Sequence, residues 1–468
     1  MSTLTTGPDR SPAPVAADAL DALRDQVAGP VLDGTTAEAD AEAATFNVAV
    51  VHRPAVVVGA TSAQDVAATV RWAAAHGLSV AAQATGHGPV HPVDGVLVTT
   101  RRMSAVVVDP QERTATFDAG TRWSDVLERS APYGLAPLVG SSSGVGAVGY
   151  TLGGGMGLLA RRHGFAADHV RSLQIVTADG VVRHVDADNE PDLFWAVRGG
   201  KGNFGVVTSM TVDLFPVATL WGGPVFYAAD DARAVLHAFR TWSAALPDEA
   251  TASVALMRFP PIEEVPEPLR GRFAVHLRYA HCGDPIEAER VLAPMLEVAA
   301  PVMSLLGPIP ATGTDVVHQD PKDPMPVHEG SRLLAELPEE AVDLLLAVAG
   351  PQHDLPVPMV ELRLMGGALA RQAAVPNAVA GRGAAYCLFA IGVLAPGLED
   401  VTPAVVSGIT TAMSAWGTEE TLVNFLGGAD ATPQGVQRAW APAARERLLA
   451  VKQAYDPANL FRHGHALR

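Results

Sequence analysis

Three glycine-rich loops constrain this chain more than any other feature of its sequence. They occupy residues 83–89, 140–157 and 199–205. Because glycine has no Cβ, backbone N–H groups in such loops can approach a ligand closely. One such loop is usually an ordinary tight turn. Three of them in one acidic chain without a Walker-type lysine favour a cradle for a pyrophosphate and a large planar cofactor.

The middle loop contains a glycine string that invites a different interpretation. Residues 144–149 match the pattern G-x-G-x-x-G of nicotinamide-dinucleotide proteins. In those proteins the string opens a helix whose N-terminus faces the pyrophosphate. Here Gly153–Gly155 and Gly157 follow closely, and each glycine costs a helix about 1 kcal/mol. The glycine density therefore opposes a helix after the string and argues against a Rossmann fold.

The composition is typical of a compact enzyme. The chain has 468 residues, of which 48% are hydrophobic and 18% charged, and about 150 residues per domain suggests two or three domains. The two cysteines, Cys282 and Cys387, are too few for a disulfide framework and too far apart for a Cys-x-x-Cys motif. No G-x-S-x-G elbow supports hydrolase chemistry, because Ser141 to Ser143 lie in one of the expected cofactor loops instead.

Charge and hydropathy exclude several partners. A formal net charge of -17, with no basic cluster that interleaves aromatic residues, argues against nucleic acid. The pairs His87 with His91 and His463 with His465 lack a third ligand, so we expect no metal site. Residues 1–14 lack the apolar core of a signal peptide, and no run of about 18 apolar residues follows. We expect a soluble, cytoplasmic protein that is not bound to a membrane.

Turn signals and hydrophobic periodicity predict an α+β fold. A β-branched run at 55–58 precedes a helix that begins near Ser62 and ends at Gly77. A second strand at 78–82 leads directly into the first glycine loop, and a hairpin turn is expected at 178–180. Further expected elements are strands at 105–108, 115–119, 173–177, 181–185 and 206–215, and helices at 17–27, 123–131 and 192–198.

The stretch 215–224, which contains prolines, is the expected domain boundary. Beyond it a second α+β domain is predicted, with helices at 231–246, 286–298 and 339–349 between strands such as 272–279 and 359–365. The tail is expected to be helical from about 436 to 455, with Pro442 restarting the helix and Pro457 ending it.

Four motifs together resemble one known family. They are Gln83-Ala84-Thr85-Gly86-His87-Gly88, residues 145–157, residues 192–208 and residues 455–463. In this order they closely resemble the berberine-bridge-enzyme-like oxidases, which belong to the p-cresol methylhydroxylase and vanillyl-alcohol oxidase class of FAD proteins. The resemblance covers residues 46–468 and is specific, because all four motifs are present.

The resemblance implies a two-part FAD-binding domain of the p-cresol methylhydroxylase type. Its first part is expected at 46–220 and its second at 425–468, after an inserted α+β substrate domain at 221–424 built on an antiparallel sheet. Residues 1–45 are expected to be a lead-in segment.

The resemblance also assigns roles around the flavin. His87 matches the family histidine that bonds to the flavin 8α-methyl carbon, so a covalent link is expected, with noncovalent binding as the alternative. Many members carry a second link through a cysteine where this chain has Ser142, so no cysteinyl link is expected. Val145 matches a position where valine accompanies fast reaction with O2, although a plain core valine is the alternative.

The full set of expected cofactor-binding residues is spread over the loops, the following strand and the tail. It comprises Gln83, Ala84, Thr85, Gly86, His87, Gly88, Ser141, Ser142, Val145, Gly146, Gly149, Tyr150, Gly153, Gly155, Gly157, Gly202, Asn203, Gly205, Val206, Val207 and Asn459.

The catalytic base is the least defined part of the expected site. Tyr150 falls where the family places a histidine or tyrosine near the flavin. Members often use a tyrosine two residues before the asparagine matched by Asn424, where this chain has Leu422, expected to point into the cavity. The alternative family glutamate is replaced by Cys387 or a neighbour. The replacements considered are Glu361, Arg363 and Tyr386, each more often structural than catalytic on its own.

The expected activity is that of an FAD-dependent oxidase acting on a small organic molecule, with O2 as electron acceptor and H2O2 as product. Abundant alanine and arginine with few lysines suggest a bacterium of high GC content, in which such oxidases often act in secondary metabolism. Two alternatives stay open: a non-redox enzyme that keeps FAD as a scaffold for a cyclisation or elimination, and a flavoprotein that binds a ligand without turnover.

Overall fold

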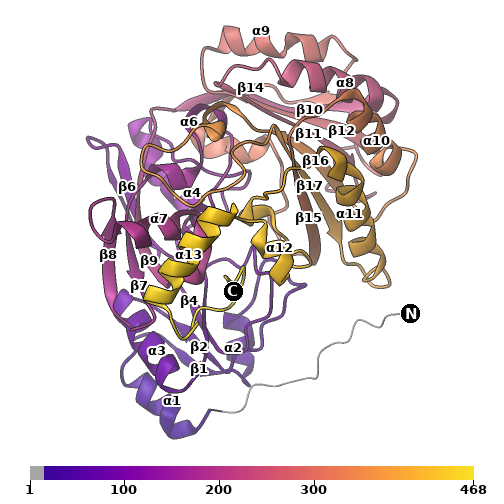
Figure 1. Ribbon diagram of the computed structural model, residues 1–468. Helices are drawn as coiled ribbons and strands as arrows, with labels where there is room; N and C mark the ends of the chain where they lie inside the picture. Colours follow the sequence, from indigo (N-terminus) through magenta and orange to yellow (C-terminus); the bar gives the residue numbers. More distant parts are fainter. Residues whose placement is uncertain (1–14, 468) are drawn as a thin grey trace.

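Three β-sheets organise the computed structural model, which describes residues 15–467. Two sheets lie in a first domain and the third carries an inserted domain (Figure 1). The helices and strands are mixed, and the third sheet is antiparallel throughout, as predicted. The expected α+β class is confirmed.

The first sheet is small and partly parallel. Its strand order is β1-β2-β4-β3, with β2 and β3 both parallel to β4. The strands are β1 (Val31–Asp33), β2 (Val56–Gly59), β3 (Val80–Gln83) and β4 (Val96–Thr99). Helix α3 (Ala63–Ala75) begins at Ser62, whose hydroxyl accepts a hydrogen bond from the Asp65 amide.

The second sheet completes the first domain, with strand order β5-β6-β9-β7-β8. Its strands are β5 (Val106–Asp109), β6 (Thr114–Asp118), β7 (Val170–Val176), β8 (Val182–Asp186) and β9 (Val206–Asp213). The helices around it are α4 (Trp123–Ser130), α5 (Ala147–Leu152), α6 (Ala160–His163) and α7 (Pro191–Gly200).

The third sheet begins at Thr219, and β15 and β13 are its edge strands. Its strands are β10 (Thr219–Ala228), β11 (Ala250–Arg258), β12 (Phe273–His281), β13 (Met303–Ser304), β14 (Gly307–Pro310), β15 (Val327–Leu334), β16 (Met359–Leu364) and β17 (Tyr386–Val393). One face packs on α8 (Ala232–Ser243), α9 (Pro285–Leu296), α10 (Glu339–Ala349) and α11 (Val401–Ala412). The opposite face is turned toward the first domain (Figure 1).

The C-terminal segment returns to the first domain. Helices α12 (Pro433–Gln437) and α13 (Pro442–Tyr455) follow the inserted domain, and α13 lies beside α7 (Figure 1). Trp440 and Leu448 are buried in the core of the first domain. The Lys452 ammonium donates to the carbonyl oxygens of Asn203 (2.7 Å) and Phe461 (2.8 Å), which ties the tail to the third glycine loop.

Two expectations about local structure are wrong. Residues 17–42 are part of the first domain rather than a lead-in, because α1 (Ala17–Arg24) and α2 (Ala37–Glu42) flank β1, which pairs with β2, and Leu20 and Leu23 of α1 are buried. A helix also begins inside the glycine string: α5 starts after Gly146 and stops at Gly153. Its six residues make it too short for a Rossmann helix. The part of the expected lead-in segment at residues 1–14 lies outside the described residues.

Candidate active site

The glycine loops meet where the two domains face each other. A Cβ built on Gly146 would lie 3.3 Å from the Ala84 Cβ, so the first and second loops are in contact. A Cβ built on Gly153 would lie 2.7 Å from Lys201 Cε and would overlap the Asn424 side chain. The second loop, the third loop and the segment that leaves the inserted domain are therefore packed together.

His87 lies half-buried in the first loop. Its ring stacks on Phe46 at 4.0 Å, and its Nδ1 lies 2.9 Å from the Thr85 hydroxyl. Burial, with a smaller contribution from the charge of Arg122, lowers the pKa of His87 to about 4. The imidazole is therefore neutral at pH 7, which is the form that can act as a nucleophile.

The glycines of the loops serve two different purposes. A Cβ built on Gly88, Gly149 or Gly202 meets no atom within 4 Å, so these three face open space. At the other predicted positions, protein atoms occupy or closely border the place where a Cβ would be. These positions are Gly86, Gly146, Gly153, Gly155, Gly157 and Gly205. Packing within the protein therefore also requires glycine at the positions of this second group.

Several predicted cofactor residues have side chains committed to the protein itself. The Gln83 amide donates to the Ala44 carbonyl and lies 2.9 Å from His52 Nε2, and the Asn203 amide donates to the carbonyls of Gly200 and His465. Val206 and Val207 are buried in the first domain. Their side chains are structural, so only backbone atoms remain available there.

Ser141, Ser142 and Val145 lie in the half-exposed part of the second loop. The neighbouring Ser143 contacts the inserted domain. Its hydroxyl and its backbone amide both donate hydrogen bonds to the Asp315 carboxylate, at 2.8 Å each. Asn459 has φ of 53° in the closing turn, and its side-chain oxygen is buried without a hydrogen-bond partner.

The inserted sheet presents a buried charged cluster to the first domain. Glu361 of β16 lies 2.8 Å from Arg363 Nε and 2.7 Å from Arg278 Nη1 of β12, and it accepts a hydrogen bond of 2.6 Å from Ser253 of β11. His318 Nε2 lies 3.7 Å from the same carboxylate. Glu361 and Arg363 are brought together as expected, while Arg278, Ser253 and His318 were missed.

A sequence signal for the missed residues exists. Strands β12 and β16 share the alternation Val-His-Leu-Arg (275–278) and Val-Glu-Leu-Arg (360–363). The valines and leucines face the helices, so the polar residues between them must share the opposite face. Arg278 and Arg363 both pair with Ser253 across the strands, which places the two arginines on either side of one residue.

Glu361 is unsuited to act as a general base. Burial alone would raise its pKa, but the charges of Arg363 and Arg278, with His318 and the Ser253 hydroxyl, hold the pKa of Glu361 well below its ordinary value. A carboxylate this well paired has little tendency to take a proton near pH 7.

Tyr386 and Cys387, two other predicted catalytic residues, do not face the open space beside the glycine loops. The Tyr386 ring packs on the helix side of the sheet, and its hydroxyl lies 2.8 Å from the Ser243 hydroxyl. Cys387 points to the opposite face but is fully buried in an apolar cluster, where burial raises its pKa to about 12. Both proposals of catalytic roles are wrong, because alternation along β17 puts one residue under the helices and the other in packed core.

Leu422 belongs to the same apolar cluster as Cys387. It is 3% exposed and packs with Met156, Leu333 and Met365. The expectation that Leu422 points into an open cavity is therefore wrong.

Tyr150 lies at the C-terminal end of α5, where its ring meets Trp123 edge-on at 5.8 Å. Its hydroxyl is buried and has no hydrogen-bond partner among the described residues. Burial raises the pKa of Tyr150 above its ordinary value, so the phenol keeps its proton. Asn424 donates to the Tyr150 carbonyl at 2.8 Å, which holds this residue against the segment that leaves the inserted domain.

Lys201 and Glu329 form a second missed pair of ionisable groups. Lys201 belongs to the third glycine loop and Glu329 to β15, and neither side chain has a hydrogen bond to another described residue. Burial lowers the pKa of Lys201 to about 8 and raises that of Glu329 to about 7, and each charge partly offsets the burial of the other. Lys201 stands within a glycine run, so its charge could have been noticed from the sequence alone.

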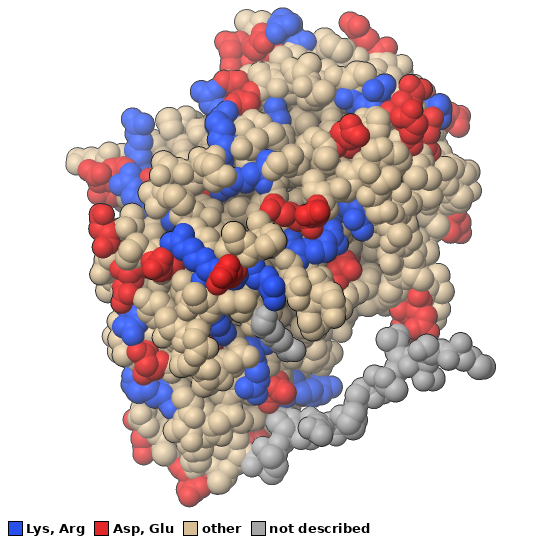
Figure 2. All heavy atoms as spheres, in the orientation of Figure 1, with Lys and Arg blue, Asp and Glu red and all other residues tan. Residues whose placement is uncertain are grey.

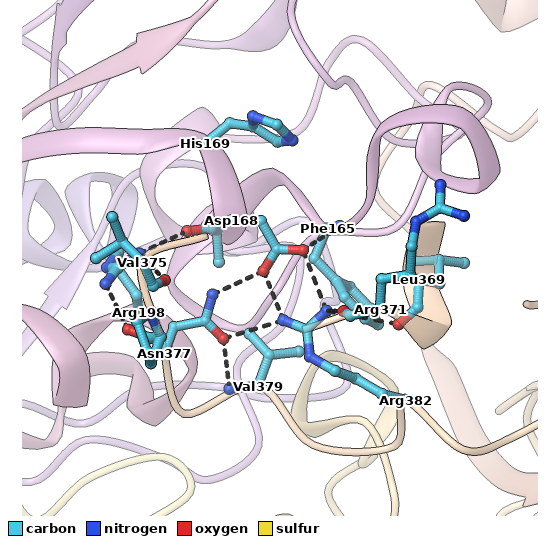
Figure 3. Close-up of polar contacts among 12 residues, drawn as sticks. Phe165, Asp168, His169, Arg198, Leu369, Arg371, Val375, Asn377, Val379 and Arg382 are labelled. Atoms are coloured by element: carbon cyan, nitrogen blue, oxygen red, sulfur yellow. Dashed lines mark hydrogen bonds and ion pairs between the residues drawn. The ribbon is translucent and has the colours of Figure 1, made fainter. Parts of the chain in front are cut away.

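An ionic clamp holds the loop before β17 on the first domain. The Arg382 guanidinium donates to both oxygens of Asp168, at 2.6 and 3.1 Å, and Asn377 donates to Asp168 at 2.7 Å (Figure 3). Arg198, next to the third glycine loop, donates to the Pro376 carbonyl at 2.7 Å. The clamp places Val379 against Gly154, so this loop covers the second glycine motif.

The residues present fit an FAD cofactor. Open space lies over Gly88, Gly149 and Gly202, whose N–H groups can face phosphate or ribityl oxygens. The neutral His87 lies in the first loop, and in the second loop the Tyr150 hydroxyl is buried without a hydrogen-bond partner among the described residues. Unpaired buried polar groups of this kind are costly and normally have a ligand or water as partner.

Comparison with known proteins matches two family models. The FAD binding domain model matches residues 54–186, and the berberine and berberine-like model matches residues 431–468. The chain belongs to the berberine-bridge-enzyme-like family of FAD-linked oxidoreductases. The two matches fall on the two parts of the first domain, which is an FAD-binding domain of the p-cresol methylhydroxylase type.

Individual relatives agree with this assignment. The FAD-linked oxidoreductase YgaK of Bacillus subtilis is 26% identical over 431 residues, which cover 89% of this chain and 92% of that protein. The crystal structure of 6-hydroxy-D-nicotine oxidase from Arthrobacter nicotinovorans has a TM-score of 0.80 and 25% identity, covering 94% of this chain and 98% of that one. Glucooligosaccharide oxidase from Acremonium strictum has a TM-score of 0.82 at 21% identity, covering 96% and 98%, and shares the fold.

The described residues contain no helix long and apolar enough to cross a membrane. Within the same residues, no three His, Cys, Asp or Glu side chains gather in a way that could hold a metal ion. Acidic and basic side chains are interspersed over the face shown in Figure 2 rather than gathered in one large patch.

Proposed function

We propose that this oxidoreductase is an oxidase with FAD held covalently by His87, acting on a small organic molecule. The observation that carries the proposal is the half-buried, neutral His87 beside the half-exposed loop of Ser142 and Val145. Ser142 cannot supply a thiolate, so His87 is the single attachment point. Glucooligosaccharide oxidase from Acremonium strictum carries a 6-S-cysteinyl, 8α-N1-histidyl FAD, and of these two attachment residues this chain offers only the histidine.

Bound FAD supplies a two-electron acceptor that can pass its electrons to O2. The substrate loses two electrons and two protons from a C–H and an adjacent O–H, N–H or aromatic position, and O2 becomes H2O2. The chain's own residues bind and orient the substrate, exclude water and accept the proton. Glu329, on the side of β15 that faces the FAD domain, is the proton acceptor best matched to neutral pH, because burial raises its pKa to about 7.

Anaerobic mixing tests the oxidase proposal. A panel of alcohols, amines and phenols is added to the purified protein without air, and a substrate should bleach the visible absorbance of the flavin. Admitting air should restore the absorbance with one H2O2 formed per reduced flavin. Reoxidation only by an artificial acceptor would refute the oxidase. A product isomeric with its substrate, formed without bleaching, would instead select a non-redox enzyme that keeps FAD as a scaffold.

A further inference from the structure

The charged cluster on the inserted sheet borders a small pocket with more buried cations than anions. The guanidinium groups of Arg161, Arg278 and Arg363 all line it. One carboxylate, Glu361, contacts two of these three groups. Asp320 acts on Arg363 from beyond ion-pair distance. Buried cations in excess are costly unless an anion accompanies them.

The two Nη nitrogens of Arg363 are available as hydrogen-bond donors on the pocket side. Its Nε is held by Glu361 at 2.8 Å, but neither of its Nη nitrogens has a hydrogen-bond partner among the described residues. Only 12% of its side chain is exposed, and its guanidinium lies 5.5 Å from the centre of the Phe425 ring. A guanidinium fixed at Nε presents its two Nη groups as a planar fork, which matches the two oxygens of a carboxylate.

Two other buried nitrogens at the pocket form no aligned hydrogen bond with the described part of the chain. His318 is 6% exposed and its Nδ1 is buried without a hydrogen bond. Arg278 is 2% exposed, and its Nη1 lies near Glu361 without an aligned N–H. By contrast, the Arg161 guanidinium is satisfied by the carbonyl oxygens of Ala250, Leu246 and Met365, so it contributes charge rather than free donors.

The pocket has the shape of a head-group site. Its volume is about 20 Å³, which is room for little more than one water-sized group. The apolar residues Met156, Leu158 and Leu369 also line it. Met156 lies at the end of the second glycine loop and Leu158 directly follows it, so a ligand body leaving this pocket would run toward the flavin loops.

We propose that the substrate carries a carboxylate, which this pocket binds through the Nη groups of Arg363, with Arg278 and His318 beside it. The inference deepens the proposed function, on which it rests, by naming the substrate class. The carboxylate supplies hydrogen-bond partners for the two Nη groups of Arg363, and the apolar lining residues receive the carbon next to it.

The test uses matched acids and amides as probes. Acetate, propionate and benzoate are each titrated into the purified, flavin-loaded protein alongside acetamide, propionamide and benzamide. Affinity is taken from the change in flavin absorbance and from the shift of the melting temperature. At least one acid should bind ten times or more tightly than its amide, because only the acid forms charge-assisted hydrogen bonds.

Arg363→Met should lower that acid's affinity by roughly 10- to 100-fold and leave the amide's affinity unchanged. Arg363→Lys keeps the charge but loses the fork, so its affinity should lie between those of the wild type and Arg363→Met. The matched control is Arg258→Met, which removes a guanidinium of the same sheet whose donors all go to backbone carbonyls. This control should bind the acid as the wild type does.

Two results would overturn the proposal: no acid binds better than its amide, or the preference survives in Arg363→Met. If Arg363→Met does not fold, the acid-to-amide ratio of the wild type and of Arg363→Lys decides. The colour of the same samples separates a failure of the carboxylate site from a failure of the proposed function. Colourless protein that prefers the acid would refute the flavin proposal alone, and yellow protein without the preference would refute the carboxylate site alone.

Discussion

Burial lowers the pKa of His87 to about 4, and the nearby charge of Arg122 adds to the effect. The sign of this shift determines how flavin attachment responds to pH. An imidazole with the ordinary pKa of 6.5 loses half its nucleophilic form when the pH reaches 6.5. His87 instead stays neutral until the pH falls close to 4.

We therefore expect the rate of covalent attachment, measured after adding FAD to flavin-free protein, to be flat from about pH 8 to about pH 6. It should decline only as the pH approaches the lowered pKa. Noncovalent FAD binding by His87→Ala, measured over the same range, shows whether binding rather than attachment limits the rate. A half-maximal rate near pH 6.5 would show that His87 is not held neutral by its surroundings.

Leu422 gives a second prediction at the scale of one residue. Because it is packed against Met156, Leu333 and Met365, Leu422→Tyr should overfill the cluster and lower the free energy of unfolding by about 1 to 3 kcal/mol. The rate of flavin reduction per folded molecule should not change. Leu305→Tyr, at a position 51% exposed, is the control and should leave stability unchanged. A strong effect on reduction rate with full stability would mean that position 422 faces the substrate.

At the scale of elements, the return of the C-terminal segment depends on one buried lysine. Lys452 of α13 binds Asp456 at 2.6 Å and the carbonyls of Asn203 and Phe461. Burial lowers the pKa of Lys452, whereas Asp456 raises it, so the ion pair stabilises the charged form. The same contacts hold the third glycine loop in place.

Lys452→Met should destabilise the protein by about 3 to 5 kcal/mol, because the Asp456 carboxylate stays buried without its partner. Melting curves in the presence and absence of added FAD measure the loss. The exposed Lys322 offers a control, since Lys322→Met should melt as the wild type does. An unchanged melting temperature for Lys452→Met would show that the tail is not needed to hold the FAD domain together.

Most elements could be predicted from turn signals and periodicity. The strand–helix–strand unit around α3 follows from β-branched runs and the Ser62 cap, and the β7–β8 hairpin follows from its turn. The helices α1 and α2 could not be assigned to the domain, because a strand as short as β1 leaves almost no pattern. Which elements pair across long separations, such as β15 with β17, depends on tertiary packing that no local signal encodes.

The candidate site was only partly predictable for a related reason. Motifs identify His87 and the loops, because backbone conformation and cofactor contact are local properties of a short segment. Glu361 depends on Arg278, His318 and Ser253, which are far apart in the sequence and meet only when β11, β12 and β16 align. The exact orientation of Tyr386 and Cys387 depends on the face that β17 turns to the helices, which follows from the sheet as a whole.

At the scale of the whole molecule, the site depends on contacts between the two domains. Asp168 with Arg382, Ser143 with Asp315, and the Asn47 side chain with Val327 each join them at separate points. These contacts hold the inserted domain against the domain that carries the glycine loops. They explain why loops from one domain and a charged sheet from the other can act on one bound molecule.

The visible spectrum of the purified protein before and after acid precipitation tests the central claim most directly. The native protein should show a flavin spectrum, and after precipitation the yellow colour should stay with the denatured chain. In His87→Ala the native protein should remain yellow, but acid should release the flavin into the supernatant. A colourless native protein, or colour that stays with the denatured His87→Ala chain, would contradict FAD attachment through His87.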